Sequence, residues 1–131
     1  MPEPVIAARA TSAADAALRF SAAGQSFVIH EWRGSGPAAM HVHHRDDEAW
    51  HVLEGTLRFR FVDREADVGA GGTVFVPAGV VHTYEAIDAR YLIILTPRLA
   101  ALIAELQRTP DREQHAEVYR THDSALLEAY R

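Results

Sequence analysis

Apolar and polar positions alternate in short runs between residues 25 and 96. In the first run Phe27, Ile29 and Glu31 alternate with residues of the opposite face, which is the two-residue period of a β-strand. Similar runs recur along this region, separated by turn signals rich in glycine, proline and aspartate. The predicted strands cover residues 27–32, 39–43, 48–53, 56–62, 73–76, 80–86 and 90–95. So many short strands are typical of an antiparallel sandwich or barrel and not of βαβ units.

The sequence also predicts the conformation of the segments that connect and precede these strands. The dipeptide Glu54-Gly55 is expected to close a hairpin between strands 48–53 and 56–62. The charged segment Asp63–Asp67 is expected to be a loop. Before the strands, residues 1–24 are alanine-rich, and Asp15–Ser21 fits either a short helix or an edge strand.

The character of the chain changes at Thr96-Pro97, where threonine is a good helix cap and proline suits the first helical position. The apolar residues that follow are spaced as on one face of a helix: Leu99, Leu102, Ile103 and Leu106. This stripe is expected to face the core or a dimer interface.

Two further helices are predicted after this one. The first opens at Thr109-Pro110 and runs to about Arg120, and Asp123 or Ser124 caps the second, which is short. Its apolar side would be formed by Leu126, Leu127 and Tyr130. We therefore expect a single all-β domain in three parts, an N-terminal arm or edge strand (1–24), a β-barrel core (25–96) and a helical C-terminal appendage (97–131).

Composition excludes several kinds of chemistry. The chain has 131 residues, of which 48% are hydrophobic, and a formal net charge of −5. All 13 basic residues are arginine, and neither lysine nor cysteine occurs, so there is no Schiff-base lysine and no thiolate nucleophile. The acidic balance does not favour nucleic acid or an anionic membrane as a partner. No apolar run approaches the length of a membrane span, so a cytoplasmic location is expected.

Histidine is the residue type that points to chemistry, because five of the eight lie between positions 41 and 82. His41 and His43 are two apart in a predicted strand, so both imidazoles project from the same face. Glu48 opens the next strand, which as an antiparallel neighbour can bring the carboxylate beside them. His82 begins a later strand. Three imidazoles and one carboxylate suit a divalent first-row transition metal and leave coordination positions open.

The spacing of these residues follows a pattern that includes glycine and proline. The chain reads H-x-H-x4-E-x6-G from His41 to Gly55, and G-x5-P-x-G-x2-H from Gly71 to His82. With His41, His43, Glu48 and Gly55 in the first motif, and Gly71, Pro77, Gly79 and His82 in the second, the chain resembles the cupin family. Two positions depart from the family pattern, with Ser35 replacing a glycine and Ala86 an asparagine.

The resemblance implies an antiparallel jelly-roll β-barrel that holds one divalent metal ion per chain (Fe, Mn, Ni or Zn). It also implies a homodimer, to which the face carrying Arg58 and Arg60 or the leucine helix could contribute. The chain is most similar to small single-domain cupins described as quercetin-dioxygenase-like. No DNA-binding segment accompanies the barrel, so no nucleic-acid partner is expected.

Other residues are candidates for a substrate pocket. Trp50, Val52 and Tyr84 share strand parity with the expected ligands and should point into the barrel, as pocket lining or as core. The Tyr84 hydroxyl offers a hydrogen bond near the metal, which makes it a candidate catalytic residue beside Glu48 as a base. His30 either faces the cavity or is a core or surface histidine whose ring nitrogens are hydrogen-bonded, without a role in the site.

Two more histidines are expected to lie outside the site. His44 breaks the strand alternation and is expected to face solvent, although it would be the substitute if His43 pointed outward. His51 falls on the face opposite to Glu48.

These residues are compatible with more than one class of function. One hypothesis is a metal-dependent, dioxygenase-like oxidoreductase acting on a small organic molecule. The alternatives are a non-redox isomerase or decarboxylase, which needs the same ligand set, and a non-catalytic binding module that serves as a sensor or accessory subunit.

Overall fold

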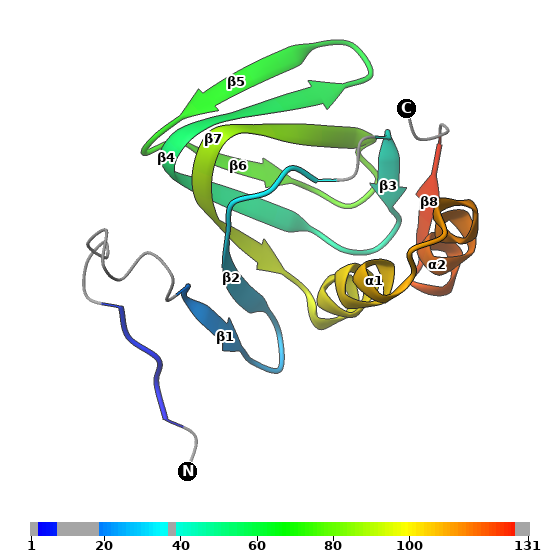
Figure 1. The fold of residues 1–131 in the computed structure, drawn as a ribbon, viewed down its shortest axis with the longest axis horizontal. Coiled ribbons are helices and arrows are strands. Elements are labelled where there is room, and N and C mark those ends of the chain that lie inside the picture. The colour runs from blue at the N-terminus through cyan, green and yellow to red at the C-terminus, as the bar shows by residue number, and fades with distance from the viewer. Residues whose placement is uncertain (1–2, 8–18, 37–38, 128–131) are drawn as a thin grey trace.

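The computed structural model describes residues 3–7, 19–36 and 39–127 and consists of one antiparallel sheet with helices at one side (Figure 1). The strands are β1 (Ser21–Ala23), β2 (Val28–Trp32), β3 (His41–His43), β4 (Glu48–Phe61), β5 (Glu65–Gly69), β6 (Thr73–Val76), β7 (His82–Leu95) and β8 (Ser124–Leu126). The helices are α1 (Pro97–Arg108), the short 3-10 turn η2 (Arg112–Gln114) and α2 (His115–Thr121). None of the helices in the described ranges is long and apolar enough to cross a membrane.

Two 14-residue strands, β4 and β7, form the centre of the sheet. They pair antiparallel from Ala49↔Ile94 to Phe61↔His82. On one side β7 continues to β2 and β1, while its first residue pairs with β3 through His41↔His82. On the other side β4 pairs with β6 near its start and with β5 near its end. The curvature of the two long strands wraps this sheet into the predicted jelly roll (Figure 1).

Side chains on the inner face of the sheet form the core, as the alternating pattern predicts. Trp50, Leu57 and Phe59 of β4 are fully buried, and the Trp50 and Phe59 rings lie 4.9 Å apart edge to face. The leucine stripe of α1 packs on this core, where Leu99 and Leu102 are buried. The stripe therefore packs against its own chain, and the homodimer stays a prediction.

The segment around Gly55 is not the predicted hairpin turn. β4 runs through it without interruption, and its pairing with β7 shifts register on both sides of Glu54. Gly55 has φ +73°, and an added Cβ would lie 2.1 Å from the carbonyl oxygen of Asp88. The glycine therefore allows a bulge that kinks a continuous strand, and the turn signal in the sequence reflects this backbone conformation.

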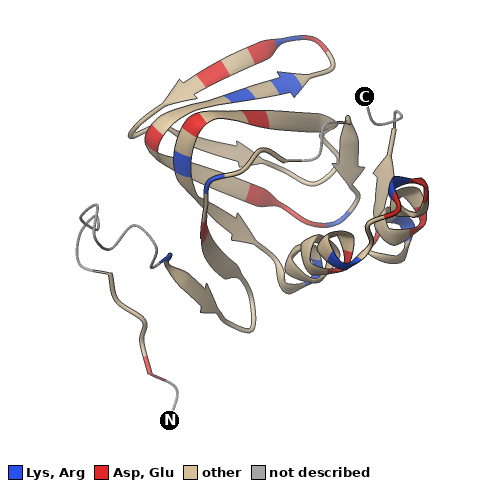
Figure 2. Ribbon diagram, in the orientation of Figure 1, with Lys and Arg blue, Asp and Glu red and all other residues tan. Residues whose placement is uncertain are grey.

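Two other predictions for the sheet were wrong. Asp63–Asp67 was expected to be a loop, but β5 begins at Glu65 and pairs with β4. Arg58 of β4 binds Asp67 of β5 at 2.8 Å, so opposite charges face each other across these two strands (Figure 2). Two strands were expected at residues 80–86 and 90–95, but the single strand β7 runs from His82 to Leu95 through the expected break, where Asp88 has φ 47°.

The C-terminal region also differs from the prediction. The second helix begins later than expected, at His115 after the turn η2. In place of a third helix, β8 pairs with β3, and Asp123 at φ 55° turns the chain into this strand. Tyr130 lies outside the described residues. At the other end of the chain, β1 is an edge strand that starts at Ser21, while residues 15–18 are not among those described.

Candidate metal centre

The four predicted ligands meet at one point inside the jelly roll. His41 and His43 lie on β3, His82 begins β7, and Glu48 begins β4. One ligand atom of each lies within 4.8 Å of the others, and all four side chains are buried. The strand pairing that produces this differs from the prediction, since the described hydrogen bonds join β3 to β7 and β8 and not to β4. Glu48 instead reaches the histidines because the sheet curls.

Two loop contacts hold the strand ends together at this point. The Asp47 carboxylate accepts a hydrogen bond from the Ala78 N–H at 2.9 Å, and the His43 carbonyl accepts one from the Gly79 N–H at 2.8 Å. Gly79 has φ +90°, a conformation that glycine adopts without strain. The turn before His82 is thereby fixed to the loop before Glu48.

Each imidazole is oriented by a hydrogen bond from its Nδ1. This atom lies 3.0 Å from the Ala39 carbonyl in His41 and 2.9 Å from the Val80 carbonyl in His82. Carbonyl oxygens only accept, so both Nδ1 atoms carry a proton, and in the neutral ring Nε2 presents its lone pair to a metal ion.

His43 is oriented by a side chain that the sequence analysis did not identify. Its Nδ1 lies 2.8 Å from Ser124 Oγ, and this hydroxyl donates to the His122 carbonyl at 3.1 Å. Because the hydroxyl proton is used there, Ser124 accepts from the imidazole, and in the neutral ring His43 Nε2 also presents a lone pair. Ser124 was expected to cap a helix, and no local pattern places it opposite His43.

The electrostatics of the group call for a cation. Glu48 Oε1 lies 2.9 Å from His43 Nε2 and 2.8 Å from His82 Nε2, which leaves lone pairs facing one another unless a proton or metal ion lies between them. Burial, reinforced by the neighbouring histidines, lowers the pKa of His41 to about 3. Three imidazole nitrogens and one buried carboxylate therefore fit a divalent transition metal.

Burial alone would raise the pKa of Glu48, but in the metal-free protein a proton on Nε2 of His43 or His82 lies between the ring and the carboxylate, and the resulting hydrogen bonds and charge lower that pKa to about 2. The carboxylate is therefore ionised at every physiological pH. Glu48 contributes the single negative charge of the four-residue group.

A cavity of about 40 Å³ borders three of the four ligands, namely His41, His43 and Glu48. It exceeds the roughly 10–15 Å³ that one water molecule occupies, so exchangeable coordination positions have space there. The remaining lining is apolar apart from two tyrosines: Tyr84, Ile93, Leu99, Leu102, Ile103, Leu106 and Tyr119.

Tyr84 lines this cavity, and its hydroxyl group is already bonded. It lies 2.9 Å from the Tyr91 hydroxyl, which donates its own proton to the Gly34 carbonyl. Tyr84 therefore donates to Tyr91 and keeps lone pairs as acceptors. Burial raises the pKa of Tyr84 to about 12, so the phenol is neutral at physiological pH.

The other candidate residues occupy different positions. Trp50 and Val52 point inward and are fully buried, with the Trp50 ring 5.3 Å from Tyr84. They pack beneath the centre, and a contact with substrate stays a prediction. His44 is exposed, as expected, and His51 lies on the outer face beside Thr73.

Replacing Ser124 with alanine is expected to weaken metal binding by about 10–100-fold, because His43 loses the group that fixes its tautomer and orientation. Titration of the metal-free protein with Zn²⁺ measures this change. Thr73→Ala is the matched control, since it removes a hydroxyl 2.8 Å from His51 Nδ1 on the outer face. Equal affinities of the Ser124→Ala variant and the wild type would contradict the role of the serine.

The metal-free protein is expected to lose stability in acid. His41 changes from its usual pKa of 6.5 to about 3 on folding, so the unfolded chain binds more protons between these values. The free energy of unfolding therefore falls as the pH drops below about 6.5, by a few kcal/mol in total, and Glu48 adds to the loss below 4.5. Urea unfolding at pH 7.5, 5.5 and 4.5 measures the trend. A free energy that stays constant over this range would disprove it.

Comparison with known proteins agrees with the fold and the motifs. The sequence profile described as "Cupin domain" matches residues 23–96, more than half of the chain. A cupin-2 domain-containing protein from Shewanella frigidimarina is 27% identical, with a TM-score of 0.50 over 60% of this chain and 78% of its own. A cupin protein from Bacteroides fragilis is 15% identical, with a TM-score of 0.51 over 72% of this chain and 82% of its own. No curated protein matches the sequence. The chain belongs to the cupin domain family.

Proposed function

We propose that this cupin is a metal-dependent oxidoreductase of the dioxygenase type that acts on a small organic molecule. The observation that carries the proposal is the convergence of three oriented imidazoles and one carboxylate beside a cavity that borders three of these four ligands and adjoins a larger pocket. That larger pocket, here called the lateral pocket, has a volume of about 350 Å³. It shares four lining residues with the metal cavity: Tyr84, Ile93, Ile103 and Leu106.

The surrounding residues support chemistry on a bound substrate oxygen. A divalent metal held by the four ligands would supply a Lewis acid with exchangeable positions for substrate or dioxygen. Glu48 is ionised and can accept a proton at a carboxylate oxygen, although its low pKa makes it a weak base. Tyr84 keeps lone pairs that can accept a hydrogen bond from a substrate hydroxyl.

Apolar side chains of α1 close the cavity on its outer side. Leu99 and Leu102 are buried there, beside Ile103 and Leu106. They limit the access of water to the centre, which would protect a reactive substrate from hydrolysis.

The second candidate is a non-catalytic binding module. The small volume of the metal cavity favours it, because about 40 Å³ holds a few water molecules and not a whole substrate. In this case a ligand would occupy the lateral pocket without reacting at the metal.

The test combines turnover with binding. Protein loaded separately with Fe²⁺, Mn²⁺, Ni²⁺ or Zn²⁺ is mixed with enolic and catecholic compounds while oxygen consumption and product masses are recorded. The proposal predicts oxygen uptake with at least one redox-active metal, and its absence in Glu48→Gln. Product formation without oxygen uptake would indicate a non-redox enzyme, and binding without any product would indicate the module.

A further inference from the structure

The lateral pocket lies between the sheet and the C-terminal helices, next to the metal cavity. Most of its lining is apolar, with Trp32 of β2 and Leu95 of β7 on the sheet side and Leu106 of α1 on the helix side. Its volume of about 350 Å³ is at the lower end of the roughly 300–1,000 Å³ of small-molecule sites, so it suits one ring and not a nucleotide. The flat face of Trp32 and the aliphatic side chains opposite suit an apolar ring.

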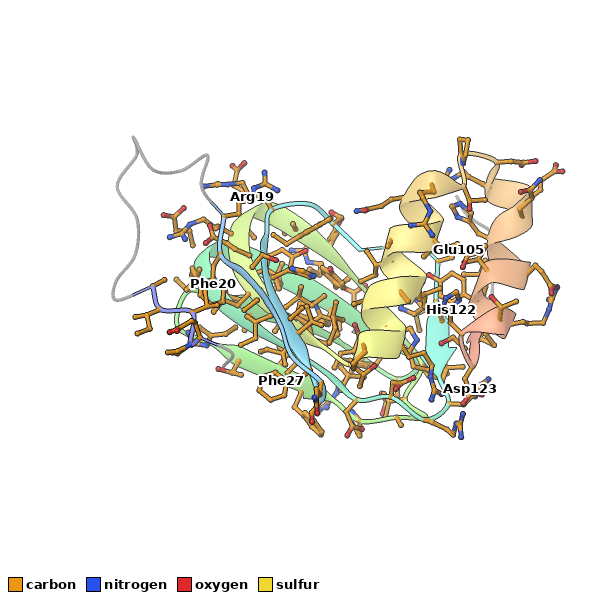
Figure 3. The ribbon with its side chains drawn as sticks, turned by 90° about the horizontal axis from the view of Figure 1, so that it is seen from below. Arg19, Phe20, Phe27, Glu105, His122 and Asp123 are labelled. Atoms are coloured by element: carbon orange, nitrogen blue, oxygen red, sulfur yellow. The ribbon has the colours of Figure 1, made fainter. Side chains whose placement is uncertain are left out.

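The helical wall of this pocket is held in place by contacts of α1 with the segment around the end of α2. Arg98 Nη1 donates to Asp123 Oδ2 at 3.0 Å. Further along the same helix, Glu105 Oε2 lies 3.4 Å from His122 Nε2 (Figure 3). The pocket is therefore preformed, and little of the binding free energy is spent on ordering its wall.

The pocket offers no unpaired charge to a ligand. Of its lining residues only Arg112 of η2 carries a formal charge at neutral pH, and no carboxylate lines it among the described residues. Arg112 and His115 already have interaction partners in the protein, and His115 Nε2 donates to the Thr109 carbonyl at 2.6 Å. A charged ligand would lose its water without gaining a counter-ion, which is costly in an apolar cavity. The pocket thus favours an uncharged compound.

His30 of β2 adds a polar contact to this lining. Its Nδ1 lies 2.8 Å from the hydroxyl oxygen of Ser21 on β1, and no other interaction of the ring is found among the described residues. Nε2 is therefore available to a ligand. The Ser21 hydroxyl either donates to Nδ1 or accepts from it, so Nε2 is correspondingly a donor or an acceptor. A ligand hydroxyl group, which both donates and accepts, matches either form of the ring.

His30 also lies close to the wall between the pocket and the metal cavity. In the antiparallel pairing of β2 with β7 it is directly opposite Ile93, so the two side chains project from the same face of the sheet. Ile93 lines both the lateral pocket and the metal cavity. A ligand bonded to His30 would therefore lie beside the side chains that separate the two cavities.

We propose that the lateral pocket binds an uncharged compound with a single apolar ring and a hydroxyl group, whose ring packs between Trp32 and Leu106 and whose hydroxyl bonds to His30 Nε2. This inference rests on the proposed function, since it names the substrate class of the same centre. Leu106 lies beyond residue 96, outside the part of the chain that matches the cupin profile. The C-terminal appendage thus completes a site whose other side is formed by the family's sheet.

The test uses benzyl alcohol as the probe and ethylbenzene as a counterpart of similar shape that lacks the hydroxyl group. NMR titration of the full-length, zinc-loaded protein follows backbone amides and histidine ring nitrogens, and the His30 signals are those absent from His30→Phe. Benzyl alcohol is expected to shift the His30 Nε2 resonance. His30→Phe is expected to weaken binding of benzyl alcohol by about three- to tenfold, the usual size of one hydrogen bond, without weakening that of ethylbenzene.

His51→Phe is the matched control for this variant. His51 Nδ1 also lies 2.8 Å from a hydroxyl directly opposite on the neighbouring strand, that of Thr73, but on the outer face. It is expected to bind both probes as the wild type does, and ethylbenzene binding by His30→Phe establishes that this variant keeps its pocket. Leu106→Trp fills the pocket and is expected to abolish binding of both probes.

The preference for an uncharged ligand is tested in the metal-free protein, where no metal ion attracts a carboxylate. Benzoate is expected to bind at least about tenfold more weakly than benzyl alcohol, which binds as it does with zinc. The inference is overturned if benzyl alcohol fails to bind or needs the metal, if His30→Phe binds it as the wild type does or His51→Phe loses as much, if Leu106→Trp still binds it, or if benzoate binds equally well. None of these results would affect metal-dependent oxygen uptake, and loss of that uptake would leave the binding of benzyl alcohol intact.

Discussion

Replacing His43 with alanine is expected to abolish stoichiometric binding of a divalent metal ion. The variant removes one of three nitrogens that converge on the centre and leaves Glu48 with one imidazole fewer. Loss of an outer hydrogen-bond partner alone typically costs 10–100-fold in metal affinity, so loss of a ligand should cost more than about 100-fold. Zinc titration of the metal-free variant, with metal analysis after dialysis, measures the effect.

The neighbouring histidine provides the control. His44 is exposed and is not part of the four-residue group, so His44→Ala is expected to bind metal as the wild type does. Circular dichroism of both variants establishes that they are folded. If His43→Ala retained full metal content, or if His44→Ala lost it, the assignment of ligands on β3 would be wrong.

Replacing Gly55 with alanine is expected to reduce the free energy of unfolding by about 3 kcal/mol. The residue has φ +73°, which costs a residue with a side chain about 1–2 kcal/mol. The added Cβ would also lie 2.1 Å from the Asp88 carbonyl oxygen, so the β4–β7 bulge must open to admit it. Urea unfolding of the variant and the wild type measures the difference.

Gly69 is the matched control for this substitution. It pairs with Thr56, the residue after Gly55, and has no heavy atom within 4 Å of the position that a Cβ would occupy. Gly69→Ala is therefore expected to change the free energy of unfolding by less than about 1 kcal/mol. A similar loss in both variants would mean that the backbone conformation at Gly55 is not what makes glycine necessary there.

Much of the candidate centre could be predicted from the sequence, because it depends on local periodicity. The two-residue period of a strand places His41 and His43 on one face, and the structure confirms this. The helix after Thr96 was predicted from its apolar stripe and its cap, and the Thr96 hydroxyl accepts the Leu99 N–H as expected. These features involve residues at most a few positions apart.

Features that depend on distant partners could not be predicted. Ser124–Leu126 is too short to show a period, and only its pairing with β3 makes it a strand and brings Ser124 to His43. Gly55 in the sequence indicated a left-handed backbone conformation, but both a hairpin turn and a β-bulge contain such a residue, so the sequence did not distinguish them. His30 and Tyr84, both candidates for a pocket, line the lateral pocket, but the part that Arg112 and His115 take in it was missed because it needs the C-terminal helices placed beside the sheet.

The central claim is that three imidazoles and one carboxylate bind a single metal ion. Anomalous X-ray diffraction at the zinc edge, from crystals of the zinc-loaded protein, tests it most directly. The account predicts one strong peak about 2.0–2.2 Å from Nε2 of His41, His43 and His82 and from a Glu48 oxygen. A zinc ion bound elsewhere, with these four side chains in contact only with one another or with water, would contradict it.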